Sequence, residues 1–222
     1  MPQAKALLYV QMNLPADAQA EQAFHAWYED HMAVRRAMPG ILNAQRYRNV
    51  DPEGPRHLAW YDLTDASALQ SPEYLALRNR EAETPRDQQV HATIPFVERR
   101  LYRCIDTDEP WAAAREGLAP FVMSVALEPQ PDQVDDFHAW YREEHSPMLM
   151  EAKGWRRIRR YEQVEGNGPR FMALHELDSL GGFDTKEYEA ALATPWRIKV
   201  TGAVVRRERL RWELIRGARG EG

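Results

Sequence analysis

Apolar residues recur along this chain first in the pattern of a strand, then of a helix, and then of strands again. In the predicted helix, Phe24, Trp27, Tyr28 and His31 fall at positions i, i+3, i+4 and i+7, so they share one helical face. Apolar segments predict strands over residues 6–12, 42–50, 57–63 and 96–105, and a second helix holds Tyr74. The expected order of elements is therefore βαββαβ.

The same pattern occurs a second time. The phrase FHAWY begins at Phe24 and again at Phe137, an offset of 113, and from the histidines His31 and His145 onward the offset is 114. Strands are expected at 120–127, 156–164, 171–177 and 204–215, and Trp140, Tyr141 and Tyr188 repeat the aromatic positions of the helices. We interpret the chain as a tandem internal duplication. Further matching pairs are Gly40/Gly154, Arg46/Arg160, Tyr47/Tyr161 and Gly54/Gly168.

A twofold βαββαβ order predicts an α+β fold of two ferredoxin-like repeats. Each repeat covers only one sheet face with helices, and a bare apolar face is unfavourable in water. We therefore expect the two repeats to pack sheet to sheet as a pseudo-dimeric α/β barrel within one chain. The predicted boundaries are 1–106 for the first repeat, 107–118 for a linker, 119–216 for the second repeat and 217–222 for a flexible tail.

The composition disfavours several classes of protein. Of 222 residues, 44% are hydrophobic and 28% charged, and the mean hydropathy is −0.65, as in ordinary soluble domains. No apolar run approaches the roughly 20 residues that span a bilayer, and the N-terminus has a strand pattern without a signal-peptide core. A cytoplasmic protein is expected. The net charge of −5 argues against nucleic acid as a partner. The arginine-rich runs at 156–161 and 204–212 alternate with apolar residues, as on the solvated face of a strand, so they do not form a basic groove.

The second repeat contains the run WYREEHSPML from Trp140 to Leu149, followed by Gly154 and Arg160-Tyr161. This run resembles the signature of the dimeric α/β-barrel superfamily, in particular its EthD-like branch, named for ethyl tert-butyl ether degradation. The first repeat matches through His31, Pro39-Gly40 and Arg46-Tyr47, so the resemblance covers most of both halves. It implies small-molecule pockets between sheet and helices. Members include cofactor-free monooxygenases, cyclases, isomerases and haem proteins, among which the fold does not choose.

His145 lies one position further from the preceding tryptophan than His31 does. The separation is four residues in the first repeat and five in the second, which rotates the side chain by about 100° unless the helix bulges. Ser146-Pro147 is expected to cap and open a new helical turn. His145 would then lie at a break between two helical pieces, where its side chain can face a cavity. The second repeat is the favoured active copy.

Imidazole titrates near neutrality and suits proton transfer in an apolar pocket. His145 is the expected acid or base, with Tyr141 as the phenolic donor to a developing enolate oxygen and His31 as the counterpart in the first repeat. The expected substrate-binding residues are Trp140, Trp27, Tyr28 and His175. His25 and His138 fall off the apolar stripe and are expected to be exposed.

The expected function is a cofactor-independent enzyme of isomerase, lyase, cyclase or monooxygenase type. Its substrate would be a small hydrophobic carbonyl or aromatic compound. Two alternatives stay open: a small-molecule-binding or accessory protein without turnover, and a structural module in which these aromatic residues only pack. The expected partners are a small hydrophobic molecule and a second copy of the chain, with neither nucleic acid nor a membrane.

No cofactor and no metal are expected. The chain lacks HExxH, and its single cysteine, Cys104, excludes a multi-cysteine site. Haem with a histidine ligand is compatible with the superfamily, but no residue identifies it. A metal held by residues from separate strands also stays open.

Overall fold

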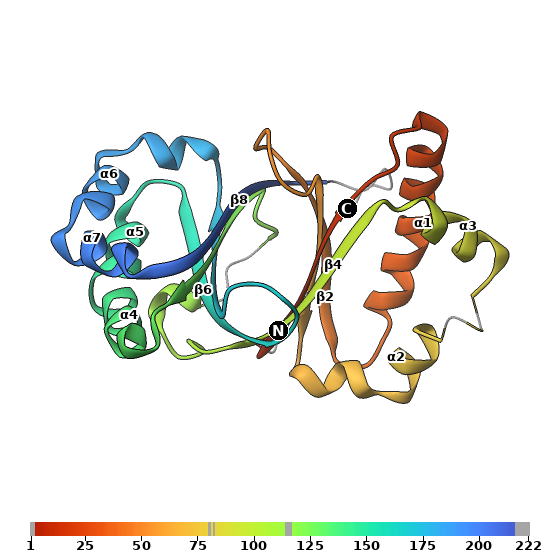
Figure 1. Cartoon of the computed structure of the whole chain (residues 1–222), viewed down its shortest axis with the longest axis horizontal. Helices are drawn as coiled ribbons and strands as arrows, with labels where there is room; N and C mark the ends of the chain where they lie inside the picture. Colours follow the sequence, from red (N-terminus) through yellow and green to blue (C-terminus); the bar gives the residue numbers. More distant parts are fainter. Residues whose placement is uncertain (1–2, 80, 82, 114–116, 216–222) are drawn as a thin grey trace. The chain divides into compact units, whose positions relative to one another are not determined.

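The structure is a computed structural model that describes residues 3–79, 81, 83–113 and 117–215 (Figure 1). The chain divides into two compact units. The first contains the described residues of Met1–Cys104, Val164–Gly166 and Leu214–Gly222, and the second contains those of Ile105–Gln163 and Asn167–Glu213. Among the described residues, no helix combines the length and the apolar character required to cross a membrane.

The first unit has a four-stranded antiparallel sheet in the order β4-β1-β3-β2. The helix α1 crosses between the first two strands, and the 3₁₀ turn Ala66–Gln70 and two short helices connect the last two. The bounds are β1 (Ala6–Asn13), α1 (Ala18–Arg36), β2 (Ile41–Asn49), β3 (His57–Leu63), α2 (Pro72–Leu77), α3 (Pro85–Thr93) and β4 (Phe96–Cys104).

The second unit repeats this plan with the strand order β8-β5-β7-β6. Its first helical segment is continuous but contains a π-helical turn, Tyr141–His145. The other elements are β5 (Phe121–Pro129), α4 (Val134–Trp140), α5 (Ser146–Glu151), β6 (Trp155–Glu165), β7 (Phe171–Leu177), α6 (Lys186–Ala193), α7 (Pro195–Gly202) and β8 (Val204–Leu214), with 3₁₀ turns at Pro110–Ala112, Pro131–Gln133 and Leu180–Asp184.

All eight predicted strands are present, and the strands over 57–63 and 171–177 match to the residue. The prediction was incomplete because each unit has one more helix, α3 or α7, before its last strand. The signal for these helices is in the sequence. Thr84 and Thr194 are N-caps whose hydroxyls accept from the amides of Asp87 and Arg197, and each is followed by a proline at the first helical position.

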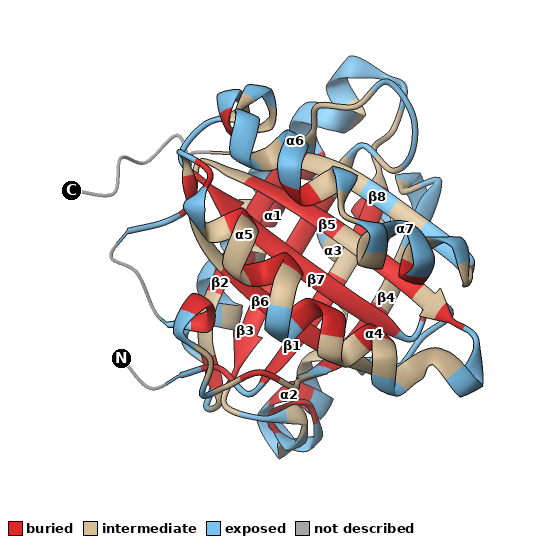
Figure 2. Ribbon diagram, turned by 90° about the vertical axis from the view of Figure 1, so that its left-hand side faces the viewer, coloured by how far each residue is buried: buried red, intermediate tan, exposed pale blue. Residues whose placement is uncertain are grey.

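In each unit the helices cover one sheet face, and the apolar residues of that face form the core. The aromatic stripe of α1 packs there as predicted, since Phe24, Trp27 and Tyr28 are buried. Phe137, Trp140 and Tyr141 do the same in the second unit. Figure 2 shows β5 and β7 mostly buried while the outer surfaces of α6 and α7 are exposed.

Glycines follow α1 and α5 where the chain reverses into the next strand. Gly40 has a φ of 81° and Gly154 a φ of 98°, a region that costs residues with a Cβ roughly 1–2 kcal/mol. A Cβ on Gly40 would also lie 2.6 Å from the Cβ of Ala68, whereas one on Gly154 would meet nothing closer than 3.8 Å. Both helical segments are therefore followed by a left-handed turn at a glycine.

The different surroundings of these glycines predict an order of destabilisation. Gly40→Ala adds a steric clash to the backbone strain and should lower the free energy of unfolding by about 2–4 kcal/mol. Gly154→Ala should cost only the strain, about 1–2 kcal/mol. Gly202→Ala is the control, because nothing lies within 4 Å of the added Cβ. Urea unfolding of the three variants measures this order, and equal losses at positions 40 and 154 would contradict it.

Candidate functional site

The π-helical turn Tyr141–His145 absorbs the extra residue of the second repeat. The ring of His145 stacks on Trp140 at 4.3 Å and 23°, nearly as His31 lies on Trp27 at 4.6 Å and 31°. The insertion therefore does not rotate His145 away from the tryptophan, because the bulge restores the relation. π-turns are rare in proteins, and those that occur are often found at functional sites.

The expected helix break at His145 is wrong. The helix continues through the π-turn into α5, and the Ser146 side chain makes no capping hydrogen bond. Ser146 is instead fully buried, and its hydroxyl has no hydrogen-bond partner among the described residues. Pro147 lies in the first turn of α5, and because the helix is continuous its missing amide hydrogen removes one helical hydrogen bond beside the π-turn.

His145 is buried and neutral. Burial lowers its pKa well below 6.5, the charges of His175 and Arg197 lower it further, and a backbone hydrogen bond at Ala191 opposes them. Its Nδ1 has no hydrogen-bond partner in the described part of the chain, and neither does the Nε1 of Trp140 beside it. Leaving such a buried polar atom unpaired costs about 1–3 kcal/mol. The stacked pair thus offers one acceptor and one donor to a polar group that enters.

Tyr141, at the start of the π-turn, lies over a buried ion pair. The guanidinium carbon of Arg160 is 4.9 Å from the centre of its ring. Arg160 binds Asp106 through two hydrogen bonds, one of them from Nη2 to Oδ1 at 2.8 Å. Burial raises the pKa of Tyr141 to about 12, although the charge of Arg160 lowers it. The phenol is therefore protonated at neutral pH and can donate a hydrogen bond.

These groups line a narrow pocket between α4 and the sheet of the second unit. Its side chains fill it closely, so a ligand would enter only by displacing some of them, such as that of Met172, which is flexible. Arg160, Tyr141 and Tyr161 supply its polar surface. The remaining lining residues are Ile105, Val125, Phe137, Phe171, Met172 and Ala173.

His175 lies on β7 within the same unit and is fully buried. The Nε1 of Trp155 donates to its Nδ1 at 3.3 Å. Burial, and to a smaller extent the charge of Arg209, lowers the pKa of His175 to about 3. His175 and His145 are close enough to interact electrostatically, but neither lines the pocket beside Tyr141.

The first unit contains a related arrangement with different polar partners. Arg46 lies 4.4 Å from the ring centre of Tyr28, and the Tyr28 hydroxyl is 3.3 Å from that of Tyr61. The strand register aligns Tyr61 with His175. Burial raises the pKa values of both phenols, so neither is ionised at neutral pH. The two units therefore share an arginine under a tyrosine but differ on the third strand.

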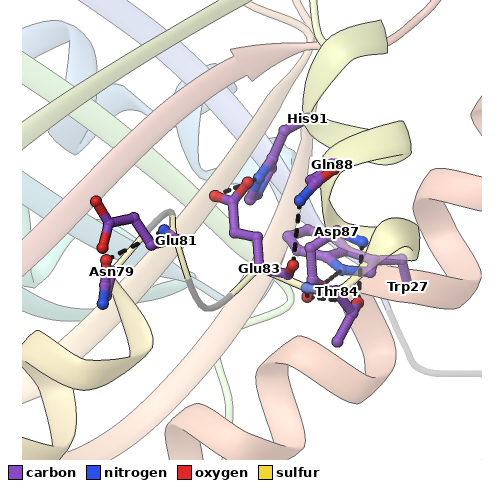
Figure 3. A network of polar contacts seen from close by, with 8 residues as sticks. All are labelled: Trp27, Asn79, Glu81, Glu83, Thr84, Asp87, Gln88 and His91. Carbon is purple, nitrogen blue, oxygen red and sulfur yellow. Dashed lines mark hydrogen bonds and ion pairs between the residues drawn. The ribbon is translucent and has the colours of Figure 1, made fainter.

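The helix α3 fixes Trp27 in the first unit, as Figure 3 shows. The Nε1 of Trp27 donates to Asp87 at 2.7 Å, and His91 lies 3.1 Å from the Glu83 carboxylate through Nδ1. His31, which stacks on the same indole, has its pKa lowered to about 3, first by burial and then by the charge of Arg35. Trp27 is thus hydrogen-bonded, whereas Trp140 has no such partner among the described residues.

The expectation that His25 and His138 are exposed is wrong. Both are only partly exposed, and each faces the buried arginine of its own unit: Nη2 of Arg46 lies 2.7 Å from Nδ1 of His25, and Nη1 of Arg160 lies 3.4 Å from Nδ1 of His138. Burial, followed by the Arg160 charge, lowers the pKa of His138 to about 4. Each histidine directly follows the first aromatic residue of the stripe, and its side chain reaches the arginine on the second strand of its own unit.

The structure brings together four of the predicted residues in the second unit. Trp140, Tyr141 and His145 lie on the helical segment, and His175 lies on β7 close to His145. Sequence reasoning missed Arg160 and Asp106. Arg160 was visible as part of the Arg-Tyr pair that recurs at an offset of 114. Asp106 had no comparable signal, because it follows β4 and meets Arg160 only after folding.

No protein-family model and no curated protein matches this chain. Solved structures do have a similar fold. An anthrone oxidase-like protein is 11% identical with a TM-score of 0.64, covering 96% of this chain and 92% of its own. A protein assigned as a monooxygenase from Fusobacterium nucleatum subsp. nucleatum ATCC 25586 is 7% identical with a TM-score of 0.62, covering 96% and 94%. Chlorite dismutase from Candidatus Nitrospira defluvii, in complex with imidazole, is 12% identical with a TM-score of 0.63, covering 97% and 92%.

These likenesses define the class of protein by its fold. They confirm the predicted α+β class with two ferredoxin-like repeats, the plan of the dimeric α/β barrels. The identities lie between 7% and 12%, so the likeness extends to the fold alone. The EthD-like branch and the origin by duplication stay predictions.

The resemblance to a superfamily that includes haem proteins makes haem the cofactor to consider. Haem iron needs an axial ligand, commonly histidine, beside a cavity that accepts the macrocycle. The pocket beside Tyr141 has no histidine in its lining, and its side chains leave no open cavity that could hold a macrocycle. His145 is stacked against Trp140, and His138 faces a guanidinium. The described residues of the second unit therefore do not fit haem.

The Arg160–Asp106 pair predicts a large loss of stability on removal of one partner. Both side chains are at most 5% exposed, so Asp106→Ala leaves a buried guanidinium uncompensated and should cost about 3–5 kcal/mol. Asp178→Ala is the control, because it breaks an ion pair of the same type whose aspartate is 61% exposed and should cost less than about 1 kcal/mol. Comparable losses in urea unfolding would contradict this account of the pair.

The low pKa of His175 predicts how stability depends on pH. The unfolded imidazole, with a pKa of about 6.5, binds a proton before the folded one, whose pKa is about 3. Its contribution is therefore complete above pH 6.5 and is lost as the pH falls toward 3, by up to about 1.4 kcal/mol per pH unit. His175→Gln keeps an acceptor for Trp155, and its unfolding free energy should change about 2 kcal/mol less between pH 7 and 5 than that of the wild type. An unchanged pH dependence would show that His175 is not buried in the neutral form.

Proposed function

We propose that the second unit is the active copy of a cofactor-independent enzyme that acts on a small hydrophobic carbonyl or aromatic compound. The reaction would be of isomerase, lyase, cyclase or monooxygenase type and would begin with proton transfer. His145 and Tyr141 are the proposed catalytic residues, and Arg160 is added to them. His31 is the corresponding residue of the first unit.

The observation that carries this proposal is the unpaired Nδ1 of His145 on a π-helical turn. Burial keeps the imidazole neutral, so its unprotonated Nδ1 carries a lone pair that can accept a proton. Tyr141 is in edge contact with the same ring at 5.4 Å and lines the pocket together with Arg160. A base, a phenolic donor and a fixed positive charge thus belong to one stretch of the helix–sheet interface.

These groups suit enolisation. The His145 Nδ1 would accept a proton from the carbon next to a carbonyl. The electron pair of that C–H bond would form a carbon–carbon double bond, and the π pair of the carbonyl would move onto its oxygen. The Tyr141 hydroxyl and the Arg160 guanidinium would stabilise the oxygen as it becomes negative. Protonated His145 is unfavourable in this buried position unless a negative charge forms beside it. The positive imidazolium and the negative enolate oxygen would therefore form together. Asp106 holds Arg160 in place without touching the substrate.

The remaining residues complete the proposal. Trp140 would donate from Nε1 to a substrate oxygen, and His175 would border the substrate on the sheet side. In the first unit Trp27 and Tyr28 correspond to Trp140 and Tyr141, and there Asp87 and Tyr61 already take up the polar atoms. We also propose that the chain arose by duplication within the EthD-like branch, that it functions in the cytoplasm, and that two copies of the chain associate.

A second candidate is a binding or accessory protein without turnover. The observation that favours it is that His145 does not line the narrow pocket, whereas Tyr141 and Arg160 do. A bound phenol or carboxylate would then be held by these two residues alone, and His145 would serve to pack Trp140.

A thermal-shift screen of small aromatic ketones, β-keto acids and phenols tests the proposal. Wild type, His145→Ala, His31→Ala and Tyr141→Phe are compared, and every compound that binds is followed for turnover by mass spectrometry. We expect a ligand that stabilises the wild type and His31→Ala by several degrees, with turnover lowered roughly 100-fold or more in His145→Ala and about 10-fold or more in Tyr141→Phe.

The outcomes separate the candidates. Binding that depends on Tyr141, without turnover in any protein, selects the binding function. Equal responses of His145→Ala and the wild type, apart from a lower melting temperature, would make His145 a packing residue. Haemin is the cofactor control: we expect no saturable Soret shift, and a shift that His145→Ala abolishes would overturn the cofactor-independent proposal.

A further inference from the structure

A cluster of potential metal ligands lies in the first unit, away from the proposed site. Glu21 and His25 are one turn apart on α1, and His57 is the first residue of β3. One ligand atom from each of the three side chains lies within 4.8 Å of the others. We propose that Glu21, His25 and His57 bind a divalent transition-metal ion such as Zn²⁺.

The distances suit a metal better than a set of hydrogen bonds. The Nε2 of His25 is 3.7 Å from a carboxylate oxygen of Glu21, which is longer than the usual 2.7–3.2 Å of a hydrogen bond. Ligand atoms about 2.1 Å from a tetrahedral zinc ion lie roughly 3.4 Å from each other. Small side-chain movements therefore close the site, and the exposed Glu21 leaves a fourth position open to water.

His57 supplies an independent observation. Its Nδ1 is buried and has no hydrogen-bond partner among the described residues, and its ring lies 5.7 Å from that of His25. A buried polar atom without a partner costs about 1–3 kcal/mol. Coordination of the imidazole to a metal, with the other nitrogen protonated, offsets part of this cost.

The two repeats differ at this site. Glu21 and His57 correspond to Val134 and Phe171, while His25 corresponds to His138. His138 packs edge-on against Phe171 at 4.6 Å, so an aromatic residue at this strand position is sufficient for packing. Packing alone therefore does not require His57 and Glu21 at these positions, and histidine and glutamate are both residue types that bind zinc.

Metal binding is coupled to Arg46. A guanidinium can only donate, so its contact with the Nδ1 of His25 at 2.7 Å keeps the proton of a neutral His25 on Nε2. A metal on Nε2 requires that proton on Nδ1, and Arg46 must then turn away. Glu29 is the available acceptor, 3.4 Å from Nη1 of Arg46. Arg46→Gln should therefore tighten metal binding, because it removes a positive charge and provides an acceptor for the Nδ1 proton.

The test is titration of the tag-free full chain with Co²⁺, followed by its visible ligand-field absorption, and with Zn²⁺ by calorimetry. The wild type should bind one ion per chain. His57→Phe recreates the residue pair of the second repeat and should weaken binding roughly 100-fold or more, since even changes to residues behind the ligands cost 10–100-fold. Glu21→Gln should weaken it as well, and His91→Gln, outside the cluster, should leave it unchanged.

Two results would overturn the site. One is the absence of saturable Co²⁺ or Zn²⁺ binding to the wild type. The other is binding to His57→Phe as tight as to the wild type, with circular dichroism showing that both are folded. Tighter binding by Arg46→Gln supports the coupling, and weaker binding by this folded variant contradicts the assigned ligand geometry.

Discussion

A buried arginine under a tyrosine ring is the interaction on which the polar chemistry of both units depends. Arg46 lies against Tyr28 and Arg160 against Tyr141, each in the interface between helix and sheet. A guanidinium there must be paired, because an uncompensated charge in an apolar surrounding is costly. In the second unit Asp106 compensates it. Burial and the charge of the arginine both lower the pKa values of the neighbouring His25 and His138 and so oppose a second proton on either ring.

The two units have diverged around this shared pair. The position opposite the helix on the third strand is Tyr61 in one unit and His175 in the other. Trp27 has a carboxylate partner on α3, whereas the equivalent position on α7 is Arg197 and Trp140 is left without one among the described residues. The first unit has more of its polar atoms paired in this region. The second unit retains an unpaired donor, Nε1 of Trp140, and an unpaired acceptor, Nδ1 of His145, among its described residues. For this reason we assign the proposed reaction to the second unit.

The π-turn shows how an added residue is accommodated without loss of the packing. A one-residue insertion in an α-helix would turn His145 by about 100°, yet the stacking on Trp140 is kept. The bulge confines the change to Tyr141–His145, and the unpaired Nδ1 of His145 lies on that turn. The unpaired atom lowers stability locally, a cost that is common at functional sites.

The sequence by itself determined the strands, the first helix of each unit and the repeated order, because periodicity and glycine turns are local properties. It also singled out Trp140, Tyr141, His145 and His175 as candidate site residues, the first three because they lie on one helical stripe, and that assignment stays a prediction. Only the tertiary structure decided what surrounds them. Segments up to 54 residues apart meet in the pairing of Arg160 with Asp106 and in the approach of His57 to His25. The tertiary structure also left the Nδ1 of His145 without a partner among the described residues. Such contacts depend on register and burial, and no local pattern encodes how many hydrogen bonds a buried atom will find.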